Sequence, residues 1–389
     1  MSQARRMVRP QPGAGAMDPA RVAALDARFM RDALAYGRRN LGRAAPNPSV
    51  GAVLVRPEGP FVLARGVTQP GGRPHAEAMA LAAAGDAARG AWLYVTLEPC
   101  SHVGRTGPCA GAVIEAGVAR VVSAIGDPNP LVAGRGHAML REAGIDVTVG
   151  VGADEARRDH IGHFTLVREK RPAVLLKLAR TADGVAARRH GPRLMITGAA
   201  AGARVHLMRA HADVIVVGVS TILADDPDLT VRLPGMAHMS PVRVVLDGRL
   251  RTPQDARVVT DARRVPTWII AAQDAPPEPE RALVAAGVEV MRVPGDALGR
   301  PQLAAALHLL GARGVTRAFC EGGPTLANAL AAAGLIEEVN LITAPAPYDG
   351  PAGAGVPAIG PDLAGCLAGM RMFADEPLGA DRLQRYERA

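Results

Sequence analysis

The chain is poor in aromatic side chains, lysine and cysteine, and it contains no long apolar run. Aromatic residues make up only 3% of its 389 residues although 48% are hydrophobic, so its cores must be built mainly from Ala, Val and Leu. No stretch approaches the roughly 20 uninterrupted apolar residues that a membrane span needs. Four cysteines in so long a chain do not form a disulfide framework. We therefore predict a protein of the reducing cytoplasm, with no membrane partner.

The positive charge is almost entirely arginine. The formal net charge is +8 and the pI is near 10, yet Lys170 and Lys177 are the only lysines in the sequence. Clustered basic side chains bind nucleic acid, but these arginines are scattered among Ala, Gly and Pro. We predict no nucleic-acid partner. A zinc-stabilised RNA-binding or tRNA-modifying protein stays open as an alternative.

The length of the chain and one charged segment that ends in proline indicate two domains. Residues 1–17 contain no acidic residue and no apolar segment, which predicts a disordered tail, with a transit peptide as the alternative. The sequence Glu-Lys-Arg-Pro at 169–172 ends a predicted helix before a new strand. We predict one domain over residues 18–170 and a second over 171–389.

Both domains are expected to be α/β, because predicted helices and strands alternate in each. Asp18 and Pro19 indicate the start of a helix that continues toward Gly37, and a hairpin is expected from the β-like runs at 50–55 and 61–64. Further helices are expected in the first domain at 75–84, 109–116, 135–143 and 154–167, and strands at 92–97, 120–125 and 145–149. Strands are expected in the second domain at 173–178, 213–217, 242–246, 267–271, 288–291 and 316–320. The Gly- and Pro-rich chain after about residue 345 predicts turns and at most one edge strand.

One histidine and two cysteines form a pattern typical of a catalytic zinc site. His75, Cys100 and Cys109 each follow a proline at an expected loop-to-helix junction, where the positive helix end favours a thiolate. Three ligands leave the fourth tetrahedral position to water, as catalysis requires. Glu77 is not needed as a ligand and can carry a proton from that water to a leaving ammonia. The pattern predicts deamination of a heterocyclic base.

The spacing of the two cysteines is unusual for such a site. Residues 101 to 108 separate them, whereas nucleobase deaminases commonly have two intervening residues. The intervening loop must therefore fold back to bring the two sulfurs together. The alternatives are a structural zinc site with His102 as the fourth ligand and a pair of buried cysteines without metal.

The motifs around these residues resemble the deaminase half of the bifunctional riboflavin-biosynthesis deaminase/reductase family. They are Asn-Pro-Ser-Val-Gly at 47–51, Pro-His-Ala-Glu at 74–77, Leu-Glu-Pro-Cys-Ser-His at 97–102 with Gly-Arg-Thr at 104–106, and Asp-Pro-Asn-Pro at 127–130 with Ala-Gly-Arg-Gly at 133–136. The resemblance implies a cytidine-deaminase-like α/β/α domain that hydrolyses the ring amine of 2,5-diamino-6-ribosylamino-4(3H)-pyrimidinone 5′-phosphate. It implies substrate contacts from Asn47, Arg105 and Thr106.

The second domain contains a possible phosphate-binding turn that is not of the Rossmann type. No Gly-x-Gly-x-x-Gly follows a strand, so a Rossmann dinucleotide site is unsupported. The sequence Glu-Gly-Gly-Pro-Thr at 321–325 follows a strand and opens a helix, so its free N–H groups could hold a pyrophosphate. A purely structural turn would have the same sequence.

Four motifs at 177–184, 219–232, 247 and 321–324 resemble, in the same order, the reductase half of that family. The resemblance implies a dihydrofolate-reductase-like α/β domain in which NADPH reduces the ribosyl group to ribityl, with Lys177 or Asp225 as the proton donor. The cofactor contacts that it implies come from Ala179, Met195, Thr221, Asp225, Gly248, Gly323, Pro324, Thr325, Leu326, Ala327, Asn328 and Ala329. The substrate contacts come from Arg193, Arg209, Leu229, Arg232 and Glu321.

Two positions depart from the reductase pattern. Met195 stands where the family usually has tryptophan, which replaces a stacking contact by a softer thioether contact. Arg193 stands where the family has a small polar residue. A deaminase with a weak or inactive reductase domain therefore stays open as an alternative. We expect Cys320 and Cys366 to be buried apolar side chains, and a homo-oligomer is compatible with the sequence.

Overall fold

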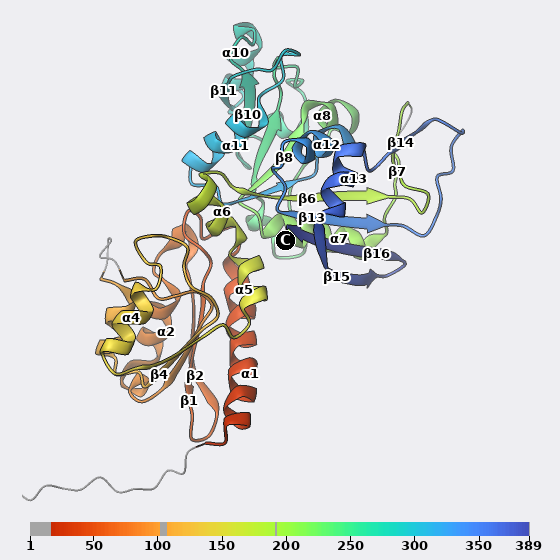
Figure 1. Ribbon diagram of the computed structural model, residues 1–389. Helices are drawn as coiled ribbons and strands as arrows, with labels where there is room; N and C mark the ends of the chain where they lie inside the picture. Colours follow the sequence, from red (N-terminus) through yellow and green to blue (C-terminus); the bar gives the residue numbers. More distant parts are fainter. Residues whose placement is uncertain (1–16, 102–106, 191–192, 389) are drawn as a thin grey trace, which may run out of the picture.

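The computed structural model describes residues 17–101, 107–190 and 193–388, which form two α/β domains (Figure 1). The first domain is coloured red to yellow and the second green to blue, and helix α6 (Ile161–Glu169) lies between them. The predicted tail falls outside the described residues except for Met17, which packs against the core of the first domain. None of the described helices combines the length and apolar character needed to cross a bilayer.

A five-stranded mixed sheet forms the centre of the first domain, in the order β2-β1-β3-β4-β5. Strand β1 pairs antiparallel with β2 and β3, whereas β3, β4 and β5 run parallel, so the predicted hairpin is confirmed. The strands are β1 (Gly51–Arg56), β2 (Phe61–Val67), β3 (Trp92–Val95), β4 (Arg120–Ser123) and β5 (Asp146–Val149). Besides α6, the helices of the first domain are α1 (Pro19–Gly37), α2 (Ala76–Ala84), α3 (Cys109–Glu115), α4 (Arg135–Glu142) and α5 (Ala153–Asp159).

Helices cover both faces of this sheet, which gives the predicted α/β/α layering. Side chains alternate along β1, so that Ala52 and Leu54 pack with α2, α3 and α4. Val53 and Val55 point to the opposite face and pack with α1 and α5. The side chain of Asp18 accepts a hydrogen bond from the first turn of α1, as its predicted capping role requires.

The helix predicted at 154–167 is wrong in one respect, because the structure has two helices that meet at His160. The backbone of His160 leaves the helical region, with φ −95° and ψ 8°. Its buried ring lies 3.1 Å from the hydroxyl of Thr96, in the loop after β3. A contact to a distant part of the chain therefore decides the break, and no local sequence signal marked it.

A nine-stranded sheet forms the centre of the second domain, in the order β11-β10-β9-β8-β12-β6-β13-β16-β15. The seven strands from β11 to β13 are parallel, and β16 and β15 add antiparallel pairs at one edge. The strands are β6 (Ala173–Arg180), β8 (Val214–Gly218), β9 (Val242–Leu246), β10 (Thr267–Ala272), β11 (Glu289–Val293), β12 (Arg317–Cys320), β13 (Glu338–Thr343), β15 (Met370–Leu378) and β16 (Asp381–Arg388), with a separate pair of β7 (Val185–Arg188) and β14 (Gly355–Pro357). The helices are α7 (Ala199–Ala210), α8 (Val219–Asp225), α9 (Arg257–Thr260), α10 (Pro277–Ala285), α11 (Leu303–Ala312), α12 (Pro324–Ala332) and α13 (Pro361–Ala368).

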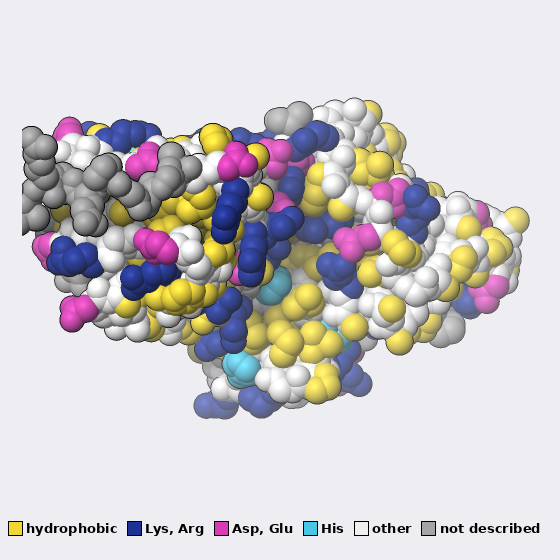
Figure 2. All heavy atoms as spheres, turned by 90° about the horizontal axis from the view of Figure 1, so that it is seen from below, with side chains coloured by type: hydrophobic (Ala, Val, Ile, Leu, Met, Phe, Trp, Pro, Cys, Tyr) yellow, Lys and Arg dark blue, Asp and Glu magenta, His cyan; other side chains and the backbone are white. Residues whose placement is uncertain are grey.

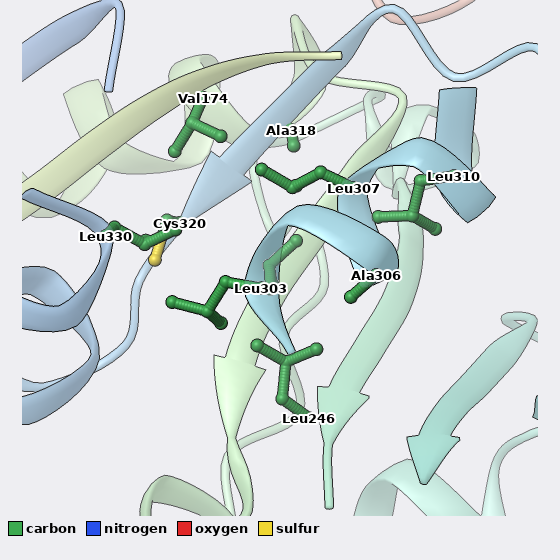
Figure 3. A pocket seen from close by; sticks show the side chains of 10 residues that line it. Val174, Leu246, Leu303, Ala306, Leu307, Leu310, Ala318, Cys320 and Leu330 are labelled. Carbon is green, nitrogen blue, oxygen red and sulfur yellow. The ribbon is translucent and has the colours of Figure 1, made fainter. Parts of the chain in front are cut away.

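The parallel strands of this sheet are buried on both faces, as their continuous apolar sequences predict. In β8, Ile215 and Val217 belong to the core under α7 to α10, whereas Val214 and Val216 belong to the core under α11, α12 and α13. A small void lies within the second of these cores, lined only by aliphatic side chains and Cys320 (Figure 3). With no polar lining group, this void is a packing defect and not a ligand site.

The two cysteines of the second domain differ in burial. Cys320 is 1% exposed, and burial raises the pKa of its thiol to about 12, so the prediction of an apolar role is confirmed. Cys366 lies on α13 and is only half-buried, so the prediction of burial is wrong there. Helix α13 covers the sheet with Leu363, which leaves the side of the helix that carries Cys366 partly exposed.

The prediction for the chain after residue 345 is wrong. That segment contains helix α13 and the long antiparallel strands β15 and β16, and the sequence reading also missed β13. Both strands of the hairpin are rich in charge, and pairs such as Arg382 with Asp375 and Arg385 with Glu338 connect neighbouring strands. These strands lie at the sheet edge and bury little apolar surface, so the hydrophobic alternation on which strand prediction depends is weak there.

Arginine side chains are spread over the surface and many of them are paired. On the face in Figure 2, Lys and Arg side chains are interspersed with acidic and hydrophobic ones. Ion pairs within 3 Å include Arg38 with Glu155 and Arg204 with Glu376. Much of the positive charge is therefore neutralised locally.

Candidate active sites

The three predicted zinc ligands meet at one point of the first domain. His75 caps α2, Cys109 is the first residue of α3, and Cys100 lies in the loop after β3. The His75 Nδ1 atom lies 3.4 Å from the Cys109 Sγ atom and 3.7 Å from the Cys100 Sγ atom. Zinc bonds of about 2.0 Å to nitrogen and 2.3 Å to sulfur place tetrahedral ligand atoms roughly 3.5–3.8 Å apart. The donor set therefore fits one zinc ion.

Among the described residues, no other His, Cys, Asp or Glu joins these three within ligand distance. The alternative fourth ligand, His102, and the predicted substrate contacts Arg105 and Thr106 lie outside the described residues. Three ligands leave one tetrahedral position open.

The surroundings of Cys100 favour its anionic form. The thiol of Cys109 donates a hydrogen bond to the Cys100 sulfur, and the backbone N–H of Cys109 lies 3.3 Å from the same atom. These contacts lower the pKa of Cys100 to about 4. A thiolate that is already stable at neutral pH is the form that binds zinc.

Glu77 lies beside the ligand set in the first turn of α2. It is 3% exposed, and burial raises the pKa of its carboxyl group to about 7. A group that titrates near neutral pH can accept a proton and return it within one turnover. Glu77 thus has the burial and the proton affinity that its predicted role needs.

Asn47 lies next to the zinc ligand His75. Its amide nitrogen donates to the carbonyl of Gly72 at 2.8 Å and lies 3.5 Å from the His75 Nε2 atom. The amide oxygen is not used by either contact. This leaves Asn47 at the edge of the site with an acceptor that a substrate could use.

Glu98 is a functional residue to which the sequence reading gave no role. Its carboxylate is 3% exposed and accepts hydrogen bonds from the backbone N–H groups of Asp127, Gly134, Gly136 and His137, at 2.9–3.2 Å. These donors come from the segment with the Asp-Pro-Asn-Pro and Ala-Gly-Arg-Gly motifs. The signal in the sequence was a single acid between a buried strand and the zinc ligand Cys100.

We expect Glu98→Gln to loosen the zinc site by releasing this segment. The amide offers one acceptor oxygen where the carboxylate offers two, so at least one buried N–H group loses its partner. Loss of charge-assisted hydrogen bonds should lower the free energy of unfolding by about 2–3 kcal/mol. Urea unfolding and zinc content would measure both effects. Glu142→Gln, on the exposed end of α4, is the matched control. An unfolding curve for Glu98→Gln like that of the control would contradict the bracing role.

Lys177, Arg209 and Glu321 form a polar cluster at the carboxyl side of the second sheet. Arg209 donates from Nε and Nη2 to the carboxylate of Glu321, at 2.5 and 2.9 Å, and from Nη1 to the carbonyl of Thr230 at 2.8 Å. Burial lowers the pKa of Lys177, and the nearby Glu321 carboxylate opposes that shift. The two predicted substrate contacts Arg209 and Glu321 are therefore paired with each other, a contact that the sequence did not reveal.

The remaining predicted substrate contacts differ in accessibility. Leu229 is 2% exposed and adopts the left-handed φ of +54°, so its side chain packs into the core. The side chain of Arg232 is 56% exposed and lies 3.4 Å from Asp228. Arg193, also exposed, lies 3.7 Å from Asp225, one of the two predicted proton donors. Arg193 and Arg232 are therefore both exposed, so the charge of either is accessible to an external phosphate.

The predicted pyrophosphate cradle includes the first turn of α12. Gly323 is the N-cap and Pro324 the first helical residue, so unpaired N–H groups are available at Thr325 and Leu326. Ala327 is fully buried, and its N–H group donates to the Gly323 carbonyl within the helix.

Other predicted cofactor contacts are distributed around this turn. Asn328 binds α13, because its side-chain oxygen accepts from the backbone of Asp362 at 3.0 Å. A Cβ atom at Gly248 would lie 1.9 Å from the Gly299 carbonyl, so that glycine is covered by another loop. Met195 is 77% exposed. The other members of the predicted set are placed as follows: Thr221 and Asp225 lie on α8, Ala179 lies on β6, and Ala329 lies on α12.

Comparison with known proteins gives a family match in each domain. Residues 24–125 match the cytidine and deoxycytidylate deaminase zinc-binding region, and residues 172–348 match the RibD C-terminal domain. The first match covers strands β1 to β4 of the five-stranded sheet, and the second covers β6 and β8 to β13 of the nine-stranded sheet.

Comparison over nearly the whole length gives the same result. The riboflavin biosynthesis protein RibD of Escherichia coli is 38% identical over 366 residues, which cover 90% of this chain and 94% of that protein. RibD of Aquifex aeolicus is 39% identical over 321 residues, covering 82% and 87%. Among solved structures, Acinetobacter baumannii RibD superposes with a TM-score of 0.80 at 32% identity, covering 94% of this chain and 99% of the other. The Thermotoga maritima diaminohydroxyphosphoribosylaminopyrimidine deaminase/5-amino-6-(5-phosphoribosylamino)uracil reductase superposes with a TM-score of 0.78 at 30% identity, covering 95% and 100%.

Proposed function

The chain belongs to the RibD family of bifunctional riboflavin-biosynthesis enzymes, and on that premise we propose the substrate and the side chains that its two sites use. It is a zinc-dependent deaminase joined to an NADPH-dependent reductase. We also propose that the boundary between the two domains falls between residues 170 and 171. It falls between the end of α6 at Glu169 and the start of β6 at Ala173.

The proposed substrate of the first domain is 2,5-diamino-6-ribosylamino-4(3H)-pyrimidinone 5′-phosphate, in agreement with the name of the Thermotoga relative. His75, Cys100 and Cys109 would hold a zinc ion, which when bound would supply a polarised water as the nucleophile. Glu77 carries protons from that water to the ring amine, which leaves as ammonia while the ring carbon becomes a carbonyl. The observation that carries this proposal is the buried carboxyl of Glu77 beside a three-ligand set with one open position.

The proposed substrate contacts in the first domain are Asn47, Arg105 and Thr106. The free amide oxygen of Asn47 would accept a hydrogen bond from the ring or the ribose. Arg105 and Thr106 would hold the phosphate through charge-assisted hydrogen bonds. Because the product keeps its ribosyl phosphate, it is the natural substrate of the reductase.

In the second domain we assign different roles to the two arginines. Arg209 orients the Glu321 carboxylate toward the sugar, since its own donors are already used. Arg232 binds the phosphate, because its guanidinium is exposed. The first turn of α12 and Thr221 would hold NADPH, which when bound would supply the hydride. The proton comes from Lys177 or Asp225.

One experiment tests both activities. The purified full chain is incubated with the pyrimidinone phosphate, with and without NADPH, while ammonia release and NADPH oxidation are followed. We expect ammonia in both reactions, and NADPH oxidation only after ammonia appears. Ammonia without NADPH oxidation would support a deaminase with an inactive reductase domain, in line with Met195 and Arg193. No ammonia at all would refute the proposed substrate. Repeating the assay with Lys177→Met and Asp225→Asn identifies the proton donor.

The remaining proposals concern partners and location. We propose a cytoplasmic enzyme that acts on small phosphorylated pyrimidines and has no nucleic-acid or membrane partner. The sequence is compatible with a homo-oligomer. RNA binding that persists at physiological salt would contradict the absence of a nucleic-acid partner. Light scattering of the purified chain measures the oligomeric state.

A further inference from the structure

The two domains meet through backbone contacts that only glycine permits. A Cβ atom at Gly42, in the loop between α1 and β1, would lie 2.6 Å from the carbonyl oxygen of Ala212 in the second domain. A Cβ atom at Gly162, on α6, would lie 2.7 Å from the carbonyl oxygen of Thr316. The second domain contributes the residues that immediately precede β8 and β12. The loop 38–50 and helix α6 therefore lie directly against the amino ends of two central strands.

A buried arginine joins these parts by hydrogen bonds. Arg317, the first residue of β12, is 9% exposed and donates from Nε to the carbonyl of His211 at 3.0 Å. Its Nη1 atom lies 3.4 Å from the carbonyl oxygen of Arg158 and 3.3 Å from that of Asp159. These are the last carbonyls of α5, which a cation stabilises. A side chain of the second domain thus caps a helix of the first domain.

From this interface, helix α6 reaches the functional edge of the first sheet. His160 lies 3.1 Å from the hydroxyl of Thr96, after β3, and His163 lies 3.0 Å from the carboxylate of Asp127, after β4. The carboxyl ends of parallel strands share one edge of a sheet, and this is the edge that carries the zinc ligand Cys100. Helix α6 is therefore braced on one side by the second domain and on the other by the deaminase site.

The loop 38–50 makes a second connection to the same site. The Arg43 carbonyl accepts from the N–H of Gly71 at 2.8 Å, and Asn47 donates to Gly72 at 2.8 Å. Those glycines belong to the turn that leads into the zinc ligand His75. The loop that rests on the second domain is thus also the loop that presents Asn47 beside the zinc ligands.

We propose that the reductase domain positions the deaminase site, with Gly42 and Arg317 as the positioning residues. The inference rests on the proposed function, since it takes Asn47 as a contact of the pyrimidine substrate. Moving the loop 38–50 away from the second domain would displace Asn47 while the three zinc ligands and Glu77 stay on α2, α3 and the loop after β3. The effect on deamination should therefore fall mainly on KM.

A pair of glycine substitutions in the full chain tests this proposal. Gly42 and Gly90 have the same φ of +74°, so alanine strains both backbones equally. A Cβ atom at Gly90 meets nothing within 4 Å, whereas at Gly42 it meets the second domain. We expect Gly42→Ala to raise the deaminase KM by about tenfold, because small displacements of a substrate contact have effects of this order. Zinc content and NADPH-dependent reduction should equal those of Gly90→Ala.

The outcomes separate this proposal from the proposed function. If the wild-type chain releases no ammonia, the proposed substrate is wrong whatever the variants do. If it does, a deaminase KM of Gly42→Ala equal to that of Gly90→Ala overturns the positioning role. Parallel loss of reduction or of zinc in Gly42→Ala would indicate general unfolding, and the Arg317 variants below then decide the proposal.

A second pair of variants keeps the test decisive if an alanine at position 42 impairs folding. Arg317→Met keeps an unbranched side chain of about the length of the aliphatic part of arginine but removes its donors, and Arg317→Lys restores a charge. Arg264→Met, which breaks only an exposed pair with Asp261, is the matched control. We expect a raised deaminase KM in Arg317→Met, partly recovered in Arg317→Lys. An Arg317→Met enzyme with the KM of the control would overturn the proposal.

Discussion

Replacing Glu77 by glutamine should abolish deamination while the zinc content stays at the wild-type level. Glutamine has the shape of the buried glutamate but cannot accept a proton, and loss of a general acid–base group lowers kcat by about 10²–10⁴-fold. The ligand set is untouched, because zinc is held by the imidazole of His75 and the sulfurs of Cys100 and Cys109. Ammonia release and metal analysis on the same preparation would measure both effects.

Two controls make the Glu77 result specific. Glu115→Gln, at the exposed end of the helix that begins with Cys109, makes the same chemical change away from the site. NADPH oxidation with the deaminated substrate should be unchanged in Glu77→Gln, because the reductase residues lie on a different sheet. Turnover of Glu77→Gln close to that of Glu115→Gln would refute the proton-carrier role. Loss of zinc in Glu77→Gln would indicate a structural role.

Replacing Cys109 by alanine should remove zinc from the protein and, with it, the deaminase activity. The substitution takes one of the three ligands, and the two that remain, His75 and Cys100, cannot hold the ion as tightly. Loss of an outer-shell partner alone costs roughly 10–100-fold in metal affinity, and loss of a ligand should cost more. Zinc per chain after gel filtration and ammonia release would check the prediction.

The matched control for this substitution is Cys320→Ala. That cysteine is also buried, but it lies in the apolar core of the second domain. Cys320→Ala should keep both zinc and deamination, and Cys109→Ala should keep NADPH-dependent reduction of the deaminated substrate. A Cys109→Ala protein that retains one zinc per chain would mean that the ligand set is wrongly assigned.

Local signals accounted for most of what the sequence predicted correctly. The zinc ligands could be found because each lies at the start of a helix or directly after a proline, so that their placement depends on only a few neighbouring residues. Most parallel strands could be found because their apolar runs are continuous, whereas β13, which begins with Glu338 and contains Asn340, was missed. The edge strand β15 and its neighbour β16 could not, since charged side chains replace the alternation that marks a half-buried strand.

Contacts between distant residues lay beyond the sequence reading. The partners of Glu98 follow it by 29 to 39 residues, and Glu321 follows its partner Arg209 by 112. No local pattern distinguishes an arginine that will pair with a carboxylate from one that will bind a phosphate. The same reason explains why Arg209 and Arg232 looked equivalent in the sequence and have different surroundings in the structure.

By itself the sequence determined the chemistry of the first domain, the order of its elements and the α/β class of both domains, because these follow from residue types at short spacing. Only the tertiary structure decided which polar groups are already paired, where α5 and α6 separate, and how the amino ends of β8 and β12 come to support the loop beside the zinc ligands. Those features depend on contacts between residues far apart in the sequence, within each domain and, at Gly42 and Gly162, between the domains, and such contacts leave no local pattern in the chain.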